Sequence, residues 1–94
     1  MDKAIQREIY ADVLERLIIH LQNRNDVQNI DLMNLSGFCR NCLSKWYVNA
    51  AEKKNIKVDY DKARELIYGM PYNKWKNNYQ KEVTKEQLEK LKEK

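Results

Sequence analysis

Two cysteines stand three positions apart near the middle of the chain, as Cys39 and Cys42. On a helix, residues at this spacing share one side, with their β-carbons about 5–6 Å apart. Two thiolates so placed can bind one metal ion or be oxidised to a disulfide. We also expect Cys39 in the first turn of a helix, where the helix dipole and Arg40 favour the thiolate. This pair is the strongest candidate for chemistry in the sequence.

A metal site needs more ligands than these two thiols, because structural zinc is bound by four. The single histidine, His20, is the next candidate, since a helix packed against the cysteines would bring it close to them. The fourth ligand would be Asp26 or Asp31, water, or a residue of a second chain. The sequence thus outlines a zinc site that includes Cys39 and Cys42.

Two other interpretations of the cysteines stay open. Free cysteine is among the most buried residue types, so both thiols could simply fill the core. A thiol pair that cycles between redox states is the third interpretation, although the βαβ pattern around thioredoxin-like motifs is missing here.

The apolar pattern around the pair predicts an all-α domain. Apolar residues recur every four positions over 4–24, from Ile5 through Ile9 and Val13 to Leu17, which is typical of an amphipathic helix. Ser36-Gly37 ends a short helix and starts a central one over 38–54. The other predicted helices are 27–35, 60–68, 72–80 and 85–93.

We therefore predict one domain over 1–94, a compact bundle of about five helices packed around the central one. The last helix, 85–94, has an apolar face of only Leu88 and Leu91, so we expect it to be weakly held and to fray.

Composition and charge limit the classes of function. The chain has 94 residues, 43% of them hydrophobic and 34% charged, and no apolar run of the ~20 residues that a spanning helix needs. Its N-terminus does not resemble a signal peptide, so we expect a cytoplasmic protein that does not enter membranes. The net charge of +4 comes wholly from 48–94, which favours a lysine-rich solvated surface over a nucleic-acid face.

Polar and aromatic side chains supply candidates for contact with a partner. A short helix, a Ser-Gly turn and a helix carrying Arg40, Asn41 and Lys45 resemble a helix-turn-helix in outline. Tyr72 and Trp75 could stack on bases, although their helical spacing favours core or subunit contact. Nucleic-acid binding is therefore an alternative that the sequence does not favour.

Catalytic motifs are missing from the sequence. Nothing pairs a nucleophile with a base and an orienting group, and there is no glycine-rich phosphate loop. The sequence favours a non-enzymatic helical module that acts through another protein or as a homodimer. The alternative from a different class is a metal-binding or thiol-redox protein that uses Cys39 and Cys42.

The segment DVQNIDLMNLSGFCRNCLSKWY, together with YGMP at Tyr68–Pro71, resembles a small bacterial family, the domain of unknown function 1244. The resemblance covers roughly residues 15–83 and implies an all-helical cytoplasmic protein. It implies no activity, because the family has no established function. It marks the following family-motif positions: His20, Cys39, Arg40, Asn41, Cys42, Lys45, Trp46 and Tyr47.

Overall fold

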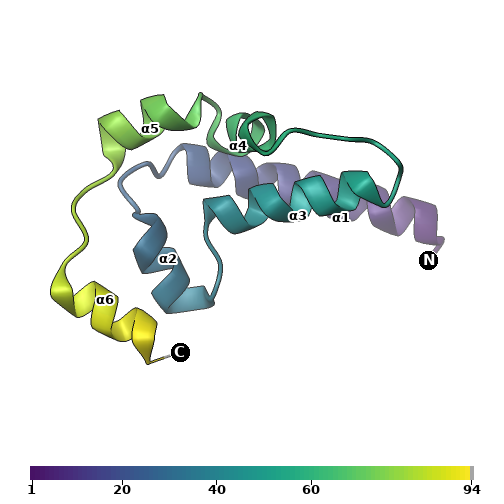
Figure 1. The fold of residues 1–94 in the computed structure, drawn as a ribbon. Helices are drawn as coiled ribbons and strands as arrows, with labels where there is room; N and C mark the ends of the chain where they lie inside the picture. Colours follow the sequence, from purple (N-terminus) through teal and green to yellow (C-terminus); the bar gives the residue numbers. More distant parts are fainter. Residues whose placement is uncertain (94) are drawn as a thin grey trace.

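The computed structural model describes residues 1–93, which form six α-helices and no strand (Figure 1). The helices are α1 (Lys3–Gln22), α2 (Asn29–Ser36), α3 (Arg40–Glu52), α4 (Tyr60–Tyr68), α5 (Tyr72–Tyr79) and α6 (Lys85–Lys92). The all-α prediction is confirmed, with six helices rather than about five. The central helix α3 is shorter than predicted at both ends, and Lys94 of the predicted last helix lies outside the described residues.

Local sequence signals account for where the helices begin and end. Asp2 caps α1 by accepting a hydrogen bond from the backbone N–H of Ala4 at 3.1 Å. Gly37 and Gly69 follow α2 and α4 with φ of 81° and 75°, the left-handed conformation that ends a helix. Thr84 and Gln87 form the predicted capping box of α6, since each side chain accepts from the other's backbone N–H.

The small core joins α1, α3 and α4. Leu21, Leu43 and Ile67 form its buried cluster, and α3 packs more extensively against α4 than any other two helices pack. Trp75 of α5 is completely buried, and its ring lies 5.1 Å from that of Tyr68. The centre of the fold is therefore the α3–α4 pair, with the end of α1 packed against α4 on one side.

The molecule is elongated, so the prediction of a compact bundle is wrong. Its radius of gyration is 15.0 Å, whereas a compact domain of this length has about 12 Å. The first residues of α1 extend past the end of α3 in Figure 1, and only Leu21 of this helix is buried. The apolar stripe of α1, from Ile5 to Leu17, is therefore largely exposed.

Candidate functional site

Three sulfur atoms lie together where α2 meets α3. Cys39 is the residue that precedes α3, and its Sγ lies 3.9 Å from the Sγ of Cys42 one turn later. The Sγ of Cys42 also lies 3.7 Å from the Sδ of Met33 in α2. Sequence reasoning found the two thiols and missed the thioether, although Met33 stands only six positions before Cys39.

Burial outweighs the helix end in setting the acidity of Cys39. Its side chain is 7% exposed, and burial raises the pKa of this thiol, which the backbone N–H groups of Asn41 and Cys42 only partly offset. The expectation of a thiol favoured in its ionised form is therefore wrong for Cys39. Both cysteines are free thiols in the structure.

The other predicted zinc ligands do not reach the cysteines. His20 is exposed on α1, Asp26 pairs with Arg24 at 3.0 Å, and Asp31 accepts a hydrogen bond from Gln87. Within residues 1–93 no three His, Cys, Asp or Glu side chains are grouped so that they could hold a metal ion. The set predicted from spacing is thus not assembled, and only Cys39 and Cys42 of that set meet.

Arg40 was predicted to contact a partner, but its side chain is buried, with 1% exposed. Its guanidinium donates to the carbonyl oxygens of Val27 and Arg24, both at 2.8 Å. It also lies over the ring of Trp75, 5.0 Å from the centroid, and burial lowers its pKa. Arg40 therefore holds the α1–α2 connection in place and presents no charge to a nucleic acid.

A chain of hydrogen bonds leads from Arg40 to α4. Its guanidinium donates to the Oδ1 of Asn29 at 3.0 Å, and the amide of Asn29 donates to the hydroxyl of Tyr68 at 3.0 Å. Tyr68 in turn donates to the Oδ1 of Asn41 at 2.8 Å, and burial raises the pKa of this phenol. The dense amides near the cysteines thus satisfy buried polar groups, as hydrogen-bonding rules require.

The remaining predicted contact residues divide between the interior and the surface. Trp75 is buried and donates through its indole N–H to Asn25 at 3.0 Å, so it is unavailable for stacking. Tyr72 is half-buried under the guanidinium of Arg64, 4.0 Å from its ring centroid. Lys45 is exposed on α3. Of these three residues, only Lys45 is therefore well exposed for contact with a nucleic acid.

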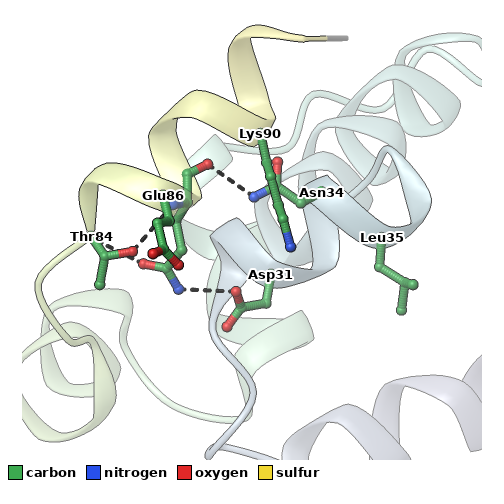
Figure 2. Close-up of a pocket in the computed structure, with 7 residues that line it drawn as sticks. Asp31, Asn34, Leu35, Thr84, Glu86 and Lys90 are labelled. Atoms are coloured by element: carbon green, nitrogen blue, oxygen red, sulfur yellow. Dashed lines mark hydrogen bonds between the residues drawn. The ribbon is translucent and has the colours of Figure 1, made fainter.

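A shallow pocket of about 460 Å³ lies between α2 and α6 (Figure 2). Its hydrogen bonds join Gln87 to Asp31 and the amide of Asn34 to the backbone of Gln87. Leu35 points away from α6 in Figure 2 and is 85% exposed. The polar contacts hold α6 against α2, and we assign them a structural role.

A largely uncovered apolar surface runs along α1. Ile5, Ile9, Val13 and Leu17 lie on one ridge with steps of four residues, and each is between 37% and 63% exposed. Tyr10 and Leu14, on the adjacent ridge, are 61% and 45% exposed. Exposed patches of this extent in small proteins mark interaction surfaces. We call Ile5, Ile9, Val13 and Leu17 together the α1 ridge.

The fold and its surfaces define a small all-helical protein with a buried polar network, a sulfur cluster and an uncovered apolar face on α1. No helix in the described chain has the length and apolarity needed to cross a membrane. The family model for a protein of unknown function, DUF1244, matches residues 27–93, and the chain belongs to that family. The match begins after α1 and extends further toward the C-terminus than the resemblance did. Comparison with curated proteins found no match.

Proposed function

We propose that this protein is a helical interaction module that pairs with a second copy of itself through the α1 ridge. The observation that carries the proposal is the exposure of that ridge, because a stripe with a strict helical period is typical of a buried face. The compartment that we expect is the cytoplasm, as the sequence analysis indicated.

The exposed area supports an interface of ordinary size. The chain exposes 7423 Å², whereas a folded monomer of 11.4 kDa exposes about 5,800 Å². The excess of about 1,600 Å² is roughly twice the 800 Å² that each partner buries in a standard interface. The apolar side chains in the first part of α1 are little buried by the rest of the chain, so pairing with a second copy would bury them.

Charges beside the α1 ridge favour an antiparallel pair. Glu8 and Asp12 lie one residue before Ile9 and Val13, and Arg16 and His20 continue the same line toward the end of the helix. A two-fold axis near Val13 sets acidic side chains of one copy against Arg16 of the other, and it sets Ile9 against Leu17. Packing of four-residue ridges gives a crossing angle of about −50°.

Sedimentation velocity of the purified chain and of two matched variants tests this proposal. Val13 is 63% exposed and Ile19 is 57% exposed, but only Val13 lies on the α1 ridge. We expect a dimer for the wild type and for Ile19→Glu, and a monomer for Val13→Glu. A monomeric wild type at ~100 μM would contradict the proposal, and so would equal association of the two variants.

A further inference from the structure

We propose that Met33, Cys39 and Cys42 form a three-coordinate site that binds a soft monovalent cation, Cu(I). These three residues lie apart from the α1 ridge, and Met33 was not among the metal ligands predicted from the sequence. Met33 lies in α2, Cys39 is the N-cap of α3 and Cys42 lies in α3, and one tight turn brings the three sulfurs together.

The distances between the sulfurs fit an ion bound among them. An ion about 2.3 Å from each of three sulfurs in a plane, the length of a metal–thiolate bond, requires sulfurs about 4 Å apart. The Sγ atoms of Cys39 and Cys42 are 3.9 Å apart, and the Sδ of Met33 is 3.7 Å from Cys42. Small side-chain rotations would complete the coordination, because methionine is flexible.

The donor set selects the metal. Thiolate and thioether sulfurs are soft ligands suited to Cu(I), whereas structural zinc takes four thiolate, imidazole or carboxylate ligands. No His, Asp or Glu of residues 1–93 completes a group of three with the two cysteines. A three-sulfur site without nitrogen or oxygen therefore favours Cu(I) over zinc.

Charge around the site is also suitable. Binding releases the two thiol protons to solvent and leaves copper in the same oxidation state, so two thiolates, one thioether and Cu(I) carry a net charge of −1. Arg40 is buried and interacts electrostatically with Cys39. Its guanidinium is not paired with a carboxylate in its hydrogen bonds, which go to carbonyl and amide oxygens, so it is well suited to offset this charge.

The backbone holds the ligands close before any ion binds. Gly37, with φ of 81°, turns the chain between Met33 and Cys39, and a left-handed residue is the usual end of a helix such as α2. Cys39 is buried, while Met33 and Cys42 are half-buried, so an ion can enter from solvent on their side. Preorganised ligands lower the entropic cost of binding.

Anaerobic titration of the reduced protein with Cu(I), in competition with the coloured chelator bicinchoninate, tests the site. We expect the wild type to take one Cu(I) per chain from the chelator. Met33→Leu keeps the size of the side chain and removes the thioether, so we expect at least about a tenfold loss of affinity. Cys42→Ser should abolish competition. Met70→Leu is the matched control, because Met70 is also half-buried but lies between α4 and α5.

Three results would overturn the assignment. The first is a wild type that takes no Cu(I) from the chelator. The second is a Met33→Leu variant that binds Cu(I) as tightly as Met70→Leu does, which would show that only the two thiols bind the ion. The third is stoichiometric Zn(II) binding that Met33→Leu leaves unchanged while Cu(I) is not held. Circular dichroism of each variant verifies that affinities are compared between folded proteins.

Discussion

The guanidinium of Arg40 lies over the indole ring of Trp75, with its carbon 5.0 Å from the ring centroid. The two side chains come from α3 and α5, and both are buried. A cation over a tryptophan face is attracted by the ring quadrupole, and the attraction strengthens when both groups are desolvated. This pair fixes the α1–α2 connection against the rest of the domain, since Arg40 also binds Val27 and Arg24.

Replacing Arg40 with Leu should therefore destabilise the protein strongly. The change leaves the carbonyls of Val27 and Arg24 without their side-chain donor, and the Oδ1 of Asn29 keeps only the backbone N–H of residue 40 at 3.4 Å. We therefore expect a loss of about 3 kcal/mol in the free energy of unfolding. Arg40→Lys should lower the free energy of unfolding by a smaller amount. It should still destabilise the protein, because an ammonium does not span two carbonyls as a guanidinium does.

Urea denaturation with the exposed Lys45→Ala as control checks this prediction. Lys45 lies on the same helix, and its replacement should change the free energy of unfolding by less than about 0.5 kcal/mol. If Arg40→Leu unfolds at the same urea concentration as the control, the buried network does not carry the stability that we assign to it.

The helices could be predicted from the sequence because their signals are local. Period, caps and turn residues act within a few positions, as Gly37, Gly69 and the Thr84 capping box show. Burial could not be predicted in the same way, because it depends on what packs against a face. The stripe of α1 has an apolar helical pattern, yet within residues 1–93 it stays largely exposed, whereas Arg40 is charged but lies in the interior.

The candidate site was half predicted. Cys39 and Cys42 meet as the spacing predicted, although Cys39 is the N-cap of α3 and not a residue of its first turn. His20, Asp26 and Asp31 were expected nearby on the assumption that the helices pack tightly around the cysteines. Asp26 pairs instead with Arg24, Asp31 accepts from Gln87, and His20 is exposed. Met33 was missed because its approach depends on the turn at Gly37.

Gly37 and Gly69 provide a matched pair for separating backbone strain from packing. Both have positive φ, which costs an alanine about 1–2 kcal/mol. A β-carbon at Gly37 meets nothing within 4 Å, whereas one at Gly69 would lie 2.9 Å from the side chain of Gln22. That side chain donates to the carbonyl of Ile67 at 3.1 Å. We expect Gly69→Ala to cost about 1 kcal/mol more than Gly37→Ala in the free energy of unfolding.

A double-mutant cycle measures the contact between residue 69 and Gln22 separately from the backbone strain. In a Gln22→Ala background the clash and the hydrogen bond are both absent, so Gly69→Ala should then cost about the same as Gly37→Ala. Chemical denaturation of the four proteins checks this. An unchanged cost of Gly69→Ala in that background would show that Gln22 is not the residue displaced.

Stability should fall at alkaline pH. Burial raises the pKa values of Cys39, Tyr60 and Tyr68 in the folded protein. The unfolded chain therefore loses these protons first, so the stabilisation is complete below the ordinary pKa values and is lost as pH rises through the folded ones. We expect the decline to begin near pH 8.5, where thiols ionise, and to steepen near pH 10, where phenols do.

Urea midpoints measured in reducing buffer between pH 7 and pH 11 check this dependence. Cys39→Ser should remove the part of the decline that begins near pH 8.5, because serine does not ionise there. Tyr68→Phe should flatten the steeper part while lowering stability at pH 7, since it removes the hydroxyl between Asn29 and Asn41. A midpoint that stays constant to pH 11 would show that these groups ionise equally in both states.

Charge reversal along α1 tests the direction of the proposed pair. In an antiparallel dimer Arg16 of each copy faces Glu8 of the other, so Arg16→Glu creates two like-charge contacts per dimer. We expect the dissociation constant to rise about fivefold in low salt and less in 0.5 M salt, because exposed ion pairs are weak and screened.

The double reversal distinguishes the two directions. Adding Glu8→Arg to Arg16→Glu restores opposite charges only when the two lines of charged residues run in opposite directions, so the dissociation constant should return to within about twofold of the wild type. In a parallel pair each line would face a different part of the partner, and the second change would not rescue the first. Sedimentation equilibrium of the three proteins at matched salt gives the constants, and failure of the rescue would leave the α1 ridge without the antiparallel arrangement that its charges indicate.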